Sequence, residues 1–199
     1  MSDAISRQNT PEFLPAGIPG MNEQVESLLA DDHASLGQLL GKLERALAGP
    51  DITRSFRLLD LFWARLAVHI RAENLHLFPA LIAAQPLCNG RDGLPTSQEL
   101  ENTLASLRVD HDFFMKDLAR AIKAMREMTA GRQPRPGELE GLRQGIIGLG
   151  NRLEAHNLLE EAHVYKWPLL LFEPGQRKKL GTQLRHELDH HPPRFEKLL

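Results

Sequence analysis

The chain has 199 residues, 42% of them hydrophobic, and a formal net charge of -2, which suits a folded domain with a sizeable core. Because the charge is small and the basic residues are spread along the chain, we expect no nucleic-acid partner and no anionic-membrane surface. The sequence has no apolar run approaching the roughly 20 residues of a membrane span, no apparent secretion signal and a single cysteine, so we expect a cytoplasmic protein.

The chain opens with a segment that does not look helical. Residues 1–20 contain three prolines and two glycines, which predict an irregular N-terminal arm. Residues 21–199 are then expected to form one domain. Its first helix is predicted from about 21 to 48, because apolar residues recur there every three or four positions and a Gly-Pro pair follows.

The next two helices are separated by a loop rich in turn residues. The second helix is predicted from about 53 to 84, with Pro79 kinking its last turns. The loop QPLCNGRDGLP follows, and TSQE at 96–99 is the pattern of a capping box, so a third helix is expected to begin there. This helix should continue until AGRQPRPG breaks it.

The last two predicted helices complete the fold. The fourth runs from about 138 to 167 or slightly beyond, and after EPG a shorter fifth helix carries Leu180, Leu184 and Leu188 on one stripe. No segment shows sustained period-two alternation, so we expect no sheet. Four long helices with short or moderate connections predict an all-α, up-down-up-down four-helix bundle with an additional short C-terminal helix packed on it.

One arrangement of histidine and glutamate occurs twice. HIRAENLH at 69–76 and HNLLEEAH at 156–163 each place His, Glu and His at offsets 0, 4 and 7, a pattern expected by chance only about 0.03 times. In a helix His69, Glu73 and His76 fall within an arc of about 60°, on the apolar stripe. They should therefore face the core, where a metal ion would compensate the cost of burying them.

The heights of the histidines along the bundle point to one site. Counted from the predicted turns, each helix places one histidine in the same layer: His33, His69, His111 and His156. The contexts DDHASL and VDHDFF also resemble each other, so the bundle reads as two copies of a helix pair, which favours two metals. Imidazole with carboxylate suits zinc, iron, manganese or copper, and bridging glutamates favour di-iron over di-zinc.

These motifs resemble the hemerythrin-like HHE cation-binding family over about residues 25–172. The motifs are D-H at 32–33, H-x-x-x-E followed by LFP, DHDF at 110–113, and H-x-x-x-E-E with VYKWP. The resemblance implies an oxo- or hydroxo-bridged centre of two iron ions. It implies terminal histidine ligands and bridging glutamates at His33, His69, His111, His156, Glu73 and Glu160. Members bind O2 or NO, sense oxygen or iron, or help restore damaged iron–sulfur centres under oxidative and nitrosative stress.

The third helix departs from the oxygen-carrying members of that family. Met115 stands four residues after His111, where a second histidine is expected. This argues against a simple oxygen carrier and makes the site more similar to that of proteins that repair iron centres.

Several further residues are weighed as ligands or neighbours of the site. His76 and His163 each complete E-x-x-H, the spacing of ferritin-like di-iron sites, so each is either an additional ligand or a histidine hydrogen-bonded nearby. Asp32 and Asp110 are expected to face solvent, with orientation of a histidine as the alternative. Tyr165 is expected to be a core aromatic residue, with gating or redox chemistry as the alternative.

Two classes of function remain open at this point. As a binding or sensor protein, the chain would take up a small diatomic ligand reversibly; as an enzyme, it would turn over peroxide or NO or act in iron–sulfur repair. A structural zinc or a mononuclear metal site is a third reading. The sequence leaves open a homodimer and does not specify the redox partner.

Overall fold

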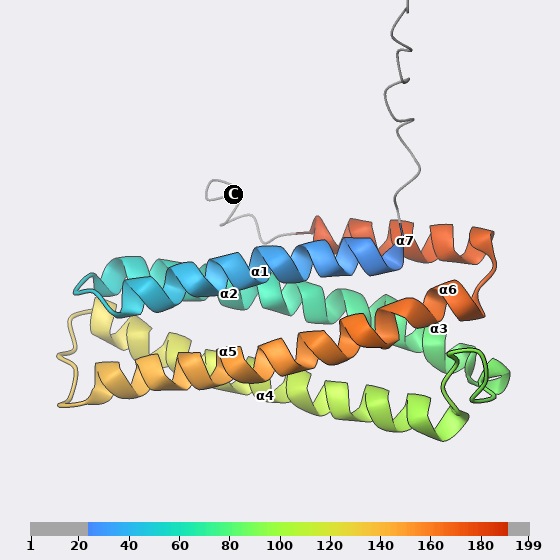
Figure 1. The fold of residues 1–199 in the computed structure, drawn as a ribbon. Helices are drawn as coiled ribbons and strands as arrows, with labels where there is room; N and C mark the ends of the chain where they lie inside the picture. Colours follow the sequence, from blue (N-terminus) through green and yellow to red (C-terminus); the bar gives the residue numbers. More distant parts are fainter. Residues whose placement is uncertain (1–23, 191–199) are drawn as a thin grey trace, which may run out of the picture.

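Four long helices form the body of the protein in a computed structural model that describes residues 24–190 (Figure 1). They run alternately in opposite directions, and their bounds are α1 Val25–Leu47, α2 Ile52–Ala72, α4 Ser97–Thr129 and α5 Glu138–Ala162. Helices α1 and α4 each pack against both α2 and α5. No strand occurs between residues 24 and 190, so the predicted all-α bundle is confirmed. The predicted irregular arm lies outside the described residues.

The predicted second helix is one helical path with an interruption. A π-helical turn, η1 (Glu73–Leu77), follows α2 and leads directly into α3 (Phe78–Ala83). Within the π turn the Phe78 amide donates to the Glu73 carbonyl, five residues back. Pro79 has no amide hydrogen and so cannot continue the regular pattern, and the helix widens just before it. The irregularity predicted at Pro79 therefore begins at Glu73, one of the predicted ligands.

The start of α4 is fixed by local hydrogen bonds. After the short helix η2 (Gln85–Leu87), the chain loops back to Thr96, whose hydroxyl accepts from the Glu99 amide at 3.2 Å. The Glu99 carboxylate in turn accepts from the Thr96 amide at 2.7 Å. This is the predicted capping box. It fixes the residue at which α4 begins, and α4 carries His111.

The predicted fourth helix was too long at its end. Helix α5 stops at Ala162, and the short helices η3 (Val164–Lys166) and α6 (Trp167–Leu171) follow. His163 leaves the helical path with φ -129° and ψ -66°. Pro168 has no amide to donate to the carbonyl four residues back, and the chain turns ahead of it. The turn carries Tyr165 into the core, where its side chain is 1% exposed.

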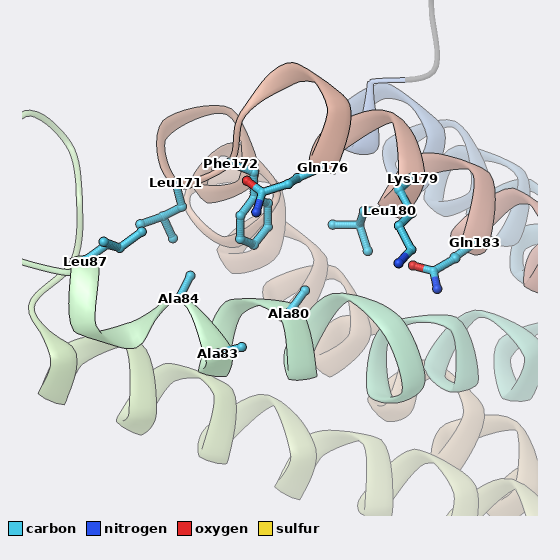
Figure 2. A pocket seen from close by; sticks show the side chains of 10 residues that line it. All are labelled: Ala80, Ala83, Ala84, Leu87, Leu171, Phe172, Gln176, Lys179, Leu180 and Gln183. Atoms are coloured by element: carbon cyan, nitrogen blue, oxygen red, sulfur yellow. The ribbon is translucent and has the colours of Figure 1, made fainter.

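The predicted fifth helix is present as α7 (Pro174–Leu188). It buries the predicted stripe of Leu180, Leu184 and Leu188 and packs against α1, α2 and η1. Between α3 and α7 lies an open groove of about 380 Å³, drawn in Figure 2. Its lining is largely alanine and leucine, with Lys179 and two glutamines at one side. In the part of the chain that the structure describes, no helix is both long and apolar enough to cross a membrane.

Candidate metal centre

The six predicted ligands come together in the core of the bundle. Each long helix contributes one histidine, η1 begins with one glutamate, and α5 contributes the other glutamate. None of the six side chains is more than 4% exposed: His33, His69, His111, His156, Glu73 and Glu160. They form two groups that share both glutamates, and the donor atoms of each group lie within 4.8 Å of one another. We call the group with His33 and His69 the first half and the group with His111 and His156 the second half.

The histidines face each other in pairs. His33 Nε2 lies 3.0 Å from His69 Nε2, and His111 Nε2 lies 3.2 Å from His156 Nε2. Two metal–nitrogen bonds of about 2.1 Å at a right angle place their nitrogens about 3.0 Å apart. Each pair is thus spaced like two neighbouring ligands on one ion.

The two carboxylates connect the halves. Glu73 points Oε1 toward His69 Nε2 at 3.5 Å and Oε2 toward His111 Nε2 at 3.2 Å. Glu160 points Oε2 toward His33 Nε2 at 3.5 Å and Oε1 toward His156 Nε2 at 3.2 Å. Each carboxylate therefore presents one oxygen to each half. This is the arrangement that two bridging carboxylates have between two metal ions.

In the first pair, hydrogen bonds on the side away from the centre place the proton of each neutral imidazole on Nδ1. The Nδ1–H of His33 donates to Glu161 Oε1 at 2.8 Å, and that of His69 donates to Asp32 Oδ2 at 2.9 Å. In the neutral tautomer each Nε2 then carries a lone pair, and the two lone pairs point at one another. Glu73 Oε2 and Glu160 Oε1 are buried without a hydrogen-bond partner. Cations between these atoms satisfy both features, so the residues fit a pair of metal ions.

The aspartates beside His33 and His111 do not face solvent as expected. Asp32 accepts from His69 on the neighbouring helix, and Asp110 accepts from His156 Nδ1 at 3.2 Å. An arginine holds each aspartate: Arg65 donates to Asp32 at 2.6 Å, and Arg152 donates to Asp110 through two nitrogens at 2.8 and 2.5 Å. Each aspartate therefore orients a histidine, which was the alternative expectation. The histidine is not its neighbour in sequence but lies on the adjacent helix: His69 for Asp32 and His156 for Asp110.

Four residues around the centre were missed by the sequence analysis, although the repeat contains them. Arg65 and Arg152 stand four residues before His69 and His156, and Asn74 and Glu161 directly follow the two glutamates. Asn74 Nδ2 lies 3.3 Å from His111 Nδ1, just as Glu161 lies beside His33 Nδ1 in the other half. Extending the repeat to R-x-x-x-H-x-x-x-E-[NE] would have found all four.

The buried carboxylates favour the protonated form of two of the histidines. Burial disfavours the charged form of His69, but the negative charges of Glu73 and Asp32 outweigh it and raise its pKa to about 10. Burial likewise opposes ionisation of Glu73, yet His69 and His111 hold its pKa well below the usual range. The pKa of His156 is raised as well, because Glu160, Glu73 and Asp110 outweigh its burial. The negative charges at the centre therefore stabilise a positive charge there, either a protonated imidazole or a metal ion.

Tyr165 is buried, as expected of a core aromatic residue, but its hydroxyl lies inside the first half. It donates to Glu73 Oε1 at 2.6 Å and lies 3.2 Å from Glu160 Oε2. It also lies 3.0 Å from His33 Nε2 and 3.3 Å from His69 Nε2. Burial and the two carboxylates raise the pKa of this phenol well above its ordinary value.

The structure does not bring His76 and His163 to the centre. His76 is 23% exposed, and its Nε2 lies 3.5 Å from Glu187 Oε2 on α7. His163 is exposed at the end of α5. Both lie on the helical turn beyond their glutamate, where the π turn and the end of α5 redirect the chain.

A surface opening reaches the edge of the centre at His33. It lies between α1 and α5, has a volume of about 560 Å³, and includes both His33 and Glu161 in its lining. Small residues of α1 leave the space: Ala30, Ala34 and Gly37. The groove of Figure 2, in contrast, is lined by no histidine and no carboxylate.

Comparison with protein families matches the chain to the hemerythrin HHE cation binding domain over residues 24–167. This match covers well over half of the chain and includes all six predicted ligands. The chain belongs to the hemerythrin HHE cation-binding family. Comparison with curated proteins found no match, and neither did comparison with solved structures. Family membership and the buried His/Glu cluster together identify this HHE protein as a metal-binding protein.

Proposed function

We propose that this HHE protein holds two iron ions between its helix pairs and uses them to bind O2 or NO reversibly, as a sensor or in the response to oxidative or nitrosative stress. The observation that carries the proposal is the shared pair of carboxylates. Glu73 and Glu160 each offer one oxygen to a histidine pair on either side. Four histidines would cap the two ends of such a centre, and ferrous iron would supply electrons and exchangeable coordination positions.

The donor set favours iron over the structural zinc alternative. Each half offers two imidazoles and two shared carboxylate oxygens, and the single cysteine, Cys88, is not among them. Structural zinc sites are typically closed by four ligands with several thiolates, whereas bridging carboxylates between nitrogen-capped ions are typical of di-iron bundles. Two ions sharing both carboxylates would leave positions for a further small ligand.

The chain's own residues would perform three tasks in ligand binding. Asp32 and Asp110 hold two of the histidines with Nε2 directed at the metal positions. The apolar core on both sides of the layer limits water at the centre. The opening between α1 and α5 would let a diatomic molecule enter the protein beside the centre.

Metal content and spectroscopy test this proposal. We expect about two iron ions per chain, with oxo-bridge absorption that dithionite removes and air restores. A Glu73→Gln, Glu160→Gln double variant should lose this stoichiometry, whereas Glu140→Gln, on the exposed start of α5, should retain it. One ion per chain, or zinc alone, would contradict the proposal.

Exposure of the ferrous protein to limited NO separates binding from turnover. A binding protein takes up NO until its iron is saturated and releases it when NO is removed. Continuous consumption of NO or peroxide beyond the amount of iron present would instead identify an enzyme.

A further inference from the structure

The two halves of the centre are related by an internal repeat, and one pair of equivalent residues breaks the equivalence. Counting five residues from Glu160 reaches Tyr165, and counting five from Glu73 reaches Phe78. The Tyr165 ring lies 5.4 Å from the ring of His33, and the Phe78 ring stacks on His111 at 5.7 Å. Each aromatic ring thus lies beside one histidine of its half, Tyr165 tilted by 37° and Phe78 parallel, but only the tyrosine carries an oxygen.

That oxygen is surrounded by the four ligand atoms of the first half. Its distances to them are 2.6, 3.0, 3.2 and 3.3 Å. Neighbouring ligands with bonds of about 2.1 Å at right angles lie about 3.0 Å apart. The phenol oxygen therefore stands to all four atoms as a fifth ligand of the same ion would. A tyrosine that served only to fill the core would need one acceptor for its hydroxyl, such as Glu73, whereas this oxygen lies within 3.3 Å of four ligand atoms.

From this geometry we infer that Tyr165 is a fifth protein ligand, binding as a phenolate to the metal held by His33 and His69. On binding, the phenol O–H bond breaks, the oxygen donates an electron pair to the metal, and the proton is released to solvent. The inference rests on the proposed function, because it requires a metal in the first half.

The two metal ions would then differ in their number of protein ligands. The first ion has five protein ligands, including a hard anionic oxygen that stabilises the ferric state. The second ion has four, since Phe78 offers no donor atom where Tyr165 offers one. An added diatomic ligand or azide should therefore bind at the second ion, next to His111 and His156.

Resonance Raman spectroscopy of the ferric protein tests the ligand directly. Tyr165 is the only tyrosine in the sequence, so any tyrosinate vibration enhanced by visible excitation belongs to it. We expect a phenolate-to-iron charge-transfer band and tyrosinate modes that shift when the protein is made with ring-deuterated tyrosine. Tyr165→Phe should abolish both signals.

The wild-type spectrum decides the inference even if the variant does not fold. Two irons per chain without tyrosinate modes would overturn it and leave the proposed function standing. Absence of iron from the wild type would overturn both. As a matched variant, Phe78→Tyr adds a phenol to the second half; we expect it to keep the Tyr165 signal and to weaken azide binding to the ferric protein. Unchanged azide affinity in a folded, iron-loaded Phe78→Tyr protein would contradict the assignment of the open position.

Discussion

At the scale of single residues, the bond between His69 and Asp32 determines which nitrogen of the histidine is available to a metal. Asp32 accepts from Nδ1 with one oxygen and receives Arg65 on the other. Its pKa is lowered because His69 and Arg65 outweigh its burial, so it stays ionised and accepts from both. The imidazole is thereby held as the tautomer whose Nε2 has a free lone pair.

Asp32→Asn is expected to weaken one metal site by about 10- to 100-fold. Arg65 would keep the amide oxygen, so the amide NH2 would face His69 Nδ1 and favour the tautomer that carries its proton on Nε2. Competition with a chelator measures the loss. Asp110→Asn should have the same effect on the other site, because Arg152 and His156 repeat the arrangement.

The control for this experiment is Asp112→Asn, whose side chain is 75% exposed and pairs with Lys116 on the surface of α4. Two metals held as tightly in Asp32→Asn as in this control would show that Asp32 does not orient a ligand.

The limits of sequence reasoning are visible in the same residues. The spacing along each helix was enough to bring the six predicted ligands into one layer, because helix periodicity fixes which side chains share a face. Asp32 was misjudged because it adjoins His33 in sequence but bonds to His69 across the helix pair. That contact depends on how two helices are rotated against each other, which the periodicity of either helix alone does not determine.

At the scale of helices, we expect the contact between α1 and α5 to control access to the centre. Small side chains on α1 leave the opening beside His33, and Ala34 is exposed on its wall. The phenyl group of Ala34→Phe would partly fill it without touching a bridging carboxylate. We expect the rate of NO binding to the ferrous protein to fall by about tenfold, equivalent to about 1.4 kcal/mol of added barrier, with the iron content unchanged.

Stopped-flow absorbance measures this rate, and Ala105→Phe provides the matched control, since Ala105 is an exposed alanine on α4 that does not line the opening. Equal rates for the two variants would mean that small molecules reach the metals by another path.

Helix boundaries show where local signals suffice and where they do not. The capping box at Thr96 is written in four consecutive residues, and it was found where predicted. The end of α5 was misplaced because the apolar pattern continues beyond Ala162 through residues that η3 and α6 also bury, such as Tyr165 and Trp167. Burial pattern alone does not distinguish one long helix from a helix followed by a turn. At this boundary the missed turn is what delivers Tyr165 to the centre.

At the scale of the whole molecule, the fold is built from two similar helix pairs that meet at the metal layer. Helices α1 and α2 supply one histidine pair, and α4 and α5 supply the other. The glutamates cross between them, so neither helix pair contains a complete site. A change in the charge of the centre, by protonation or metal binding, is therefore expected to change the free energy of unfolding of the whole bundle.

This coupling predicts a pH dependence for the metal-free protein. The pKa of His69 is raised from 6.5 to about 10 in the fold, so its contribution to stability is fully present below pH 6.5 and is lost as the pH rises through about 10. Over this window the free energy of unfolding should fall by at most about 1.4 kcal/mol per pH unit for this one group. A bound metal takes the place of the proton, and competition from protons weakens as the pH rises.

The stability gained from metal should therefore widen with pH, because the metal-free protein weakens while metal binding strengthens. Denaturant unfolding of both forms at about pH 7 and pH 9 measures the two free energies. His186→Gln, at an exposed histidine on α7, should leave the pH dependence unchanged, whereas His69→Gln should flatten it in the metal-free form. If the metal-free protein were equally stable at both pH values, the proton on His69 would not be standing in for a metal. The buried carboxylates would then have to be balanced by some other charge in the core.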